Sequence, residues 1–154
     1  MVLRLKEKEL AAVGISVVAG CKPCTDHHVP AARKAGASDD EIKQAMAEAL
    51  AVRRSTTEIM EGYALAHLGE AGQDVDPGRV GEKTRVKELV RVGAAFAVNC
   101  VASLETELAA AEAAGIPREE IAQIVKLSAF IKERAASHVE RLCGMRRRRE
   151  VVNG

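Results

Sequence analysis

Residues 9–28 of this 154-residue chain read ELAAVGISVVAGCKPCTDHH, and the fold and the chemistry are both signalled in this stretch. Apolar and charged residues recur at helical spacing from Leu5 to Ala19, which predicts a first helix that ends at a turn containing Gly20. Two cysteines and a histidine follow this turn. We therefore expect any chemistry of the protein to lie where the first helix meets the second.

The second helix is predicted from about Cys24 to Ala35, because Pro23 is best tolerated in a helix's first turn. A helix N-terminus and a nearby histidine both favour a cysteine thiolate. Cys24 has both, since His28 lies one turn later on the same face. Cys21 is close enough in sequence to form a disulfide with Cys24 if the turn geometry allows it.

Glu9 offers a carboxylate on the preceding helix that could hold or relay a proton if that helix folds back. Pro30 lies inside the second helix and predicts a kink or an early end there. A capping box at Ser38 to Glu41 then opens a long helix, predicted from Asp39 to about Leu68. The glycine-rich segment from Gly69 to Gly81 is predicted to be the main linker.

After the linker the chain repeats itself at an offset of 79 residues without a gap. The matched positions include Glu9 with Glu88, Gly14 with Gly93, Cys21 with Cys100, Gly36 with Gly115 and Ile42 with Ile121. We interpret this as two copies of a helical hairpin plus a long helix, packed about a pseudo-twofold axis. The predicted organisation is a first repeat at 1–68, the linker at 69–81, a second repeat at 82–144 and a basic tail at 145–154. The two repeats are expected to form one compact domain.

The second copy lacks most of the chemical residues of the first. Ser103 stands where the first copy has Cys24, Glu107 where it has His28, and Ala102 where it has Pro23. We therefore interpret the second copy as structural. No alternating pattern indicates a strand, so the predicted fold class is all-α.

Composition narrows the possible partners. Lys plus Arg number 23 against 22 for Asp plus Glu, and aromatic residues make up only 2% of the chain. This argues against a nucleic-acid surface, and no apolar run reaches the length of a membrane span. We recognise no signal peptide and expect a cytoplasmic protein. The run Arg146 to Arg149 is predicted to be a solvated end.

The remaining cysteines and histidines, together with two arginines of the long helix, are predicted to be structural or exposed. Cys100 is expected to be a buried small residue and Cys143 a free thiol. His27 should lie on the surface or at a subunit contact, and His67 and His138 are taken as structural or exposed. Arg53 and Arg54 should lie on a solvated face.

Three interpretations of the Cys21 and Cys24 pair remain open from the residues alone. In a reducing compartment a close pair can be redox-active, can bind a metal, or can be two inert buried thiols. A metal site would use both cysteines with His28 and Glu9. We expect no cofactor and no metal, so the redox interpretation is preferred.

The spacing of Glu9, Cys21, Cys24 and His28, followed by Ala35, Gly36 and an acid-capped long helix, resembles the signature of the carboxymuconolactone decarboxylase superfamily. The resemblance is to its branch similar to the alkylhydroperoxidase AhpD, and both copies carry the framework. It implies an AhpD-like helical fold that assembles into homo-oligomers, commonly trimers or hexamers.

The resemblance also implies roles for the site residues. Cys24 would attack a peroxide, Cys21 would resolve the product into a disulfide, and Glu9 and His28 would relay protons. The family's alkylhydroperoxidase has a further histidine just before the second cysteine, where this chain has Pro23, so the relay is one member short. The decarboxylase that names the superfamily lacks the cysteine pair, which argues against lactone decarboxylation here.

We therefore expect a thiol-dependent peroxidase that takes a hydroperoxide as substrate and a dithiol as reductant. The alternatives are a thiol-disulfide reductase acting on a disulfide substrate, and a metal-binding or redox-sensing protein that is not an enzyme.

Overall fold

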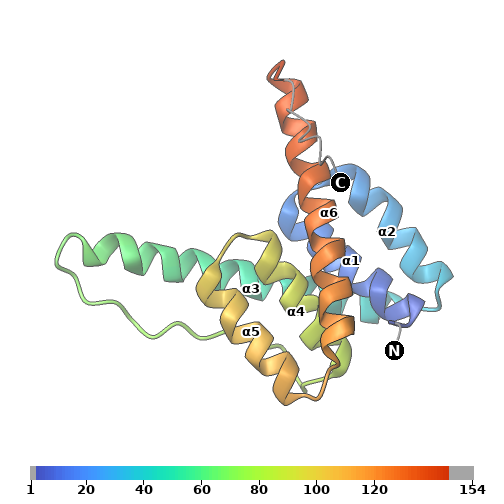
Figure 1. Cartoon of the computed structure of the whole chain (residues 1–154), viewed down its shortest axis with the longest axis horizontal. Helices are drawn as coiled ribbons and strands as arrows, with labels where there is room; N and C mark the ends of the chain where they lie inside the picture. Colours follow the sequence, from blue (N-terminus) through green and yellow to red (C-terminus); the bar gives the residue numbers. More distant parts are fainter. Residues whose placement is uncertain (1–2, 146–154) are drawn as a thin grey trace, which may run out of the picture.

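The computed structural model describes residues 3–145, and this range is all-helical, as predicted. Its helices are α1 (Leu5–Ala19), α2 (Lys22–Lys34), α3 (Asp39–Ala66), α4 (Arg85–Ala97), α5 (Val101–Ala113) and α6 (Arg118–Leu142). The long helices α3 and α6 each extend beyond the body formed by the others (Figure 1). None of the helices in residues 3–145 is long and apolar enough to cross a membrane. The predicted basic run at 146–149 lies outside the described residues.

The observed helix ends follow the local sequence closely. α1 has the predicted bounds, and Gly20 ends it in the left-handed conformation that glycine adopts without strain (φ 71°). α2 begins at Lys22, two residues before the predicted start, because the Sγ of Cys21 acts as the cap and accepts the Cys24 N–H. Pro30 lies inside α2, which continues to Lys34 and so does not end early.

The long helix α3 begins at the predicted capping box. Ser38 Oγ accepts the Glu41 N–H at 3.1 Å, and a Glu41 carboxylate oxygen accepts the Ser38 N–H at 2.8 Å. α3 ends at Ala66, two residues before the predicted end. The chain then returns along α3 without further helix until α4, and this return contains the segment interpreted as the linker (Figure 1).

The central helices are α1 and α4, which pack against each other. α1 also contacts α2, α3 and α6, while α4 also contacts α5, α6 and α3. The starts of α2 and α5, and those of α3 and α6, lie 79 residues apart, in the register of the predicted repeat. Each long helix also reaches across to the other half, because α6 contacts α2 and α3 contacts α5.

The close approach of α1 and α4 depends on two glycines. A Cβ on Gly93 would lie 2.5 Å from Cδ1 and 2.7 Å from Cγ1 of Ile15, and a Cβ on Gly14 would lie 2.9 Å from Cγ1 of Val90. A Cβ cannot be accommodated at these distances, so the side chains of Ile15 and Val90 pack directly against the glycine backbone of the facing helix. These glycines are 79 residues apart and serve the same contact from opposite sides.

We expect Gly93→Ala to lower the free energy of unfolding by about 1–2 kcal/mol. Overpacking a tight core costs about 1–3 kcal/mol, which exceeds the roughly 1 kcal/mol that alanine gains in helix propensity. Gly62→Ala is the matched control, because Gly62 lies within α3 and a Cβ there would meet nothing within 4 Å. Urea denaturation should show Gly62→Ala unchanged or more stable. Equal effects of the two substitutions would contradict the packing explanation.

Candidate active site

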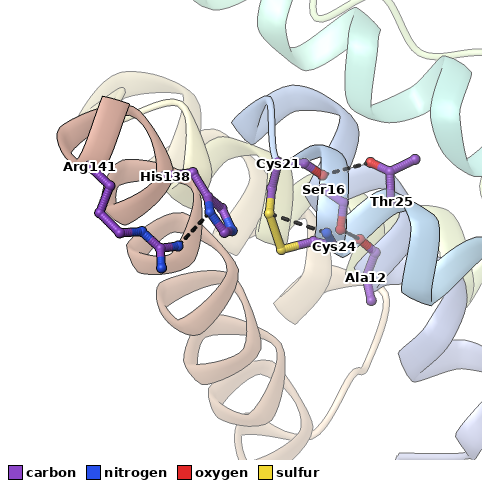
Figure 2. Close-up of a disulfide and its surroundings, with 7 residues drawn as sticks. All are labelled: Ala12, Ser16, Cys21, Cys24, Thr25, His138 and Arg141. Carbon is purple, nitrogen blue, oxygen red and sulfur yellow. Dashed lines mark hydrogen bonds between the residues drawn. A yellow bond between two sulfur atoms is a disulfide. The ribbon is translucent and has the colours of Figure 1, made fainter. Parts of the chain in front are cut away.

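The predicted cysteine pair forms a disulfide at the junction of α1 and α2. Cys21 and Cys24 are bonded, with their Cα atoms 5.2 Å apart, and Figure 2 shows the bond at the start of α2. The turn geometry therefore allows the bond that the spacing suggested. Cys21 is 1% exposed and Cys24 5% exposed, so both are buried and Cys24 is the more accessible.

Glu9 and His28 lie together, although they are on different helices. The Nδ1 of His28 lies 2.7 Å from a carboxylate oxygen of Glu9, and both side chains are mostly buried. The contact exists because α2 packs back along α1, which was the condition stated for Glu9 to take part. A carboxylate bonded to one ring nitrogen fixes the orientation of the imidazole and leaves the other nitrogen for proton transfer.

A pocket of about 320 Å³ opens beside the disulfide. We call it the cysteine pocket; its lining residues are Pro23, Cys24, His27, His28, Phe130 and Arg134. Cys21 is not among the lining residues, so a molecule in the cysteine pocket would meet the sulfur of Cys24 first. Cys24 and His28 thus share one cavity, as their spacing on a helix predicted.

A second pocket of about 470 Å³ shares His27, His28 and Phe130 with the cysteine pocket. We call it the side pocket; its other lining residues are Leu3, Lys8, Glu9, Gln123, Lys126 and Leu127. The Glu9 and His28 pair therefore lies where the two cavities meet.

One wall of both pockets comes from α6, and this wall was missed in the sequence. Phe130 and Arg134 line the cysteine pocket, and the Arg134 guanidinium lies over the Phe130 ring, 5.7 Å from its centroid. The predicted repeat placed both residues in a structural half, and nothing in the sequence pairs α6 with α2. The only available signal is the matching register of α3 and α6, which does not by itself say which hairpin each long helix covers.

The corresponding place in the second half contains a buried charge network. Arg91 is 0% exposed and donates to a carboxylate oxygen of Glu48 at 2.9 Å and to both carboxylate oxygens of Glu107 at 2.8 and 3.0 Å. Glu107 is the residue that occupies the position of His28. The pKa of Arg91 is raised overall, because its bonds to Glu107 and Glu48 outweigh the opposing effect of burial.

The linker completes this network. The Pro77 carbonyl accepts a hydrogen bond from Arg91 at 2.6 Å, and Arg79 donates to Glu88 at 2.5 Å and to Glu107 at 3.0 Å. Glu88 is 1% exposed and corresponds to Glu9, so both glutamates are turned inward. In the second half, however, the inward glutamate is neutralised by arginine and not paired with a histidine. The predicted linker therefore has a structural role that its composition did not reveal.

Cys100 is buried, as expected, and occupies the cap position of α5 that Cys21 occupies in α2. Burial raises the pKa of the Cys100 thiol, but hydrogen bonds with Ser103 and Thr56 outweigh this and lower it below its ordinary value. Thr56 and Ser103 are also joined to each other at 2.8 Å. The thiol has no cysteine partner among the described residues.

The other singled-out residues lie mostly at the surface. His27, His67 and Cys143 are exposed, and His27 contacts the edge of the His28 ring. Arg53 is exposed and donates to the Val18 carbonyl at 2.5 Å. No group of three or more His, Cys, Asp or Glu side chains in residues 3–145 is arranged to hold a metal ion.

Comparison with known proteins gives one match. Residues 2–67 match the family model described as the carboxymuconolactone decarboxylase family. The match covers Glu9, both cysteines of the disulfide and His28, and it stops before the predicted second copy. Neither the curated proteins nor the solved structures gave a match to the chain.

We expect Arg91→Met to lower the free energy of unfolding by about 3–5 kcal/mol, because it leaves Glu48 and Glu107 buried without their cation. Arg54→Met on the exposed face of α3 is the control and should change stability by less than about 0.5 kcal/mol. Thermal and urea unfolding would measure both. A double variant Arg91→Met with Glu107→Gln should recover part of the loss, and no recovery would argue against charge burial as the cause.

Proposed function

We propose, from the match of residues 2–67 to the carboxymuconolactone decarboxylase family, that the protein is a thiol-dependent hydroperoxide reductase. The observation that carries the proposal is the arrangement around the cysteine pocket. Cys24 of the bonded cysteine pair lines this pocket, and a histidine oriented by a glutamate lines the same cavity. These are the groups that a peroxide-reducing cycle needs: an attacking thiol, a resolving thiol and a proton relay.

The cycle begins with the reduced pair. The Cys24 thiolate attacks one peroxide oxygen, an S–O bond forms, the O–O bond breaks, and the other oxygen leaves as an alcohol with a proton from His28. The Cys21 thiolate then attacks the sulfur of the resulting sulfenic acid, the S–S bond forms and the S–O bond breaks, and the departing hydroxide takes a proton from the Glu9 and His28 relay to leave as water. A dithiol donor reduces the disulfide by two exchange steps and is itself oxidised.

Cys24 is assigned the attack because it lines the pocket and shares it with His28. A thiolate at Cys21 would be stabilised more by the helix N-terminus, because its Sγ caps α2 and accepts the Cys24 N–H at 3.3 Å. A stabilised thiolate suits the resolving step, which also needs an anionic sulfur. In this proposal Cys24 is the cysteine that the substrate can reach, and Cys21 is the one whose thiolate the helix stabilises.

Glu9 and His28 supply the proton relay in this proposal. Because Nδ1 of His28 is held by Glu9, the free Nε2 is the atom that exchanges a proton with Cys24 or the leaving oxygen. Their partial burial strengthens the interaction compared with a surface pair.

The side pocket favours an organic hydroperoxide over hydrogen peroxide itself. Leu3, Leu127 and Phe130 line it with apolar surface, while Lys8 and Lys126 add positive charge. Such a lining suits a substrate with an apolar body and an anionic group. We also propose that the protein is a cytoplasmic homo-oligomer. The projecting ends of α3 and α6 expose apolar side chains that subunits could cover, namely Met60, Tyr63 and Leu142.

A second candidate is a thiol-disulfide reductase with little peroxidase activity. The observation that favours it is Pro23, which stands between the cysteines in the first turn of α2, where the resembled peroxidase has a relay histidine. The cysteine pocket would then admit a disulfide in place of a peroxide.

The first test is consumption of an organic hydroperoxide by the purified protein with a dithiol reductant. Wild type should turn over, Cys24→Ser should not, and Cys21→Ser should complete one oxidation and then stall as a sulfenic acid. Cys143→Ser is the control, because this exposed thiol lies outside the site. Absence of turnover in reduced wild-type protein, with disulfide exchange intact, would replace the peroxidase proposal by the reductase.

We expect Glu9→Gln to lower kcat/KM for the hydroperoxide by about 10²-fold or more, the usual range for an acid–base group. The amide can still bond to His28 but carries no charge to stabilise its protonated form. His28→Phe should lose at least as much. Glu58→Gln, an exposed glutamate on α3, serves as the control and should leave kcat/KM unchanged. Wild-type kinetics in Glu9→Gln would remove Glu9 from the relay.

A further inference from the structure

His138, on the last turns of α6, lies in the surroundings of the disulfide. Figure 2 shows its imidazole between the Arg141 guanidinium and the two sulfur atoms. The position agrees with the cysteine pocket, because Arg134 lines that pocket together with Cys24 and His138 follows Arg134 by one helical turn. The sequence alone placed this histidine in the structural half and gave it no role.

One nitrogen of His138 is held by Arg141. The Nδ1 lies 2.7 Å from a guanidinium nitrogen of Arg141, and a guanidinium can only donate hydrogen bonds. Nδ1 must therefore accept, and the neutral ring carries its proton on Nε2. Arg141 thus fixes the tautomer in which Nε2 is a donor.

The other nitrogen lacks a partner. Nε2 of His138 is buried and makes no hydrogen bond in the part of the chain that the structure describes. A buried donor without an acceptor is costly, and native proteins rarely keep one without a reason. The disulfide sulfurs in these surroundings accept no hydrogen bond from Nε2, and they are weak acceptors, whereas a thiolate is a strong one.

We propose that Nε2 of His138 is the hydrogen-bond donor to the Cys21–Cys24 sulfurs in the reduced form, and that it favours opening of the disulfide. The donor is unsatisfied when the sulfurs are bonded to each other and satisfied when a thiolate appears. The inference rests on the proposed redox role of the pair, but it does not require that a peroxide is the oxidant.

The step it assists is the first exchange with a dithiol donor. A donor thiolate attacks Sγ of Cys24 from the cysteine pocket, an S–S bond forms between them, and the Cys21–Cys24 bond breaks. The electron pair goes to Sγ of Cys21, whose thiolate is stabilised by the N–H of His138. The donor's second thiolate then displaces Cys24 from the mixed disulfide and leaves as an oxidised disulfide. The two protons released by the donor's thiols restore the thiols of Cys21 and Cys24.

The test is the redox equilibrium of the pair, measured by thiol counting in mixtures of reduced and oxidised dithiothreitol. A Cys143→Ser background removes the exposed thiol that would complicate the count. His138→Asn keeps an amide near Nδ1 but has no group at Nε2, while His138→Gln keeps a donor near Nε2. Val139→Ala, at an exposed neighbouring residue on α6, is the control for disturbance of the helix.

We expect His138→Asn and His138→Phe to lower the equilibrium constant for reduction by roughly tenfold, which is about 30 mV for this two-electron couple. The equilibrium constant of His138→Gln should stay within about twofold of wild type, because glutamine keeps a hydrogen-bond donor near the position of Nε2. Val139→Ala should not differ from wild type. Wild-type equilibrium in His138→Asn, or an equal loss in His138→Gln and His138→Phe, would overturn the proposal.

This measurement separates the inference from the proposed function. It uses no peroxide, so a shifted equilibrium in a protein without hydroperoxide turnover would keep the role of His138 and reject the peroxidase. Hydroperoxide turnover by the wild type, together with an unchanged redox equilibrium in the His138 variants, would keep the peroxidase proposal and reject the role of His138. If His138→Phe fails to fold, as judged by circular dichroism, the comparison of the Asn and Gln variants decides.

Discussion

The contact of α1 with α4 is the constraint on which the other features depend. Gly14 and Gly93 let side chains of the facing helix pack directly on the backbone, and each central helix also contacts its own hairpin partner and both long helices. A bulkier residue at this crossing would separate the halves and withdraw α6 from α2. The walls of the cysteine pocket are therefore set by a glycine contact that includes none of the residues lining it.

Positions 79 residues apart both contain inward glutamates, but their partners differ. In the first half, an inward glutamate pairs with a histidine beside an open cavity. In the second half, the inward glutamates are held by Arg79 and Arg91, and the linker contributes a carbonyl to the same cluster. Buried charges of this kind are stabilised by pairing with opposite charges, so these glutamates are committed to arginines.

The sequence predicted the elements better than their assembly. The bounds of α1, the capping box of α3 and the linker follow from local rules, because caps, glycine turns and helical periodicity act over a few residues. The pairing of Glu9 with His28 was foreseeable as a possibility from two adjacent helices. Phe130, Arg134 and His138 were not, because their nearness to Cys24 depends on which hairpin α6 covers. Which hairpin α6 covers depends on long-range packing, and the local sequence pattern does not predict it.

The position of α6 means that the recognisable family segment does not contain its own site. Residues 2–67 supply the sulfurs, the histidine and the glutamate, yet part of the cavity in which they would work is built from residues beyond 117. A fragment that ended at residue 67 would keep both cysteines, the histidine and the glutamate but would lose the α6 wall of both pockets.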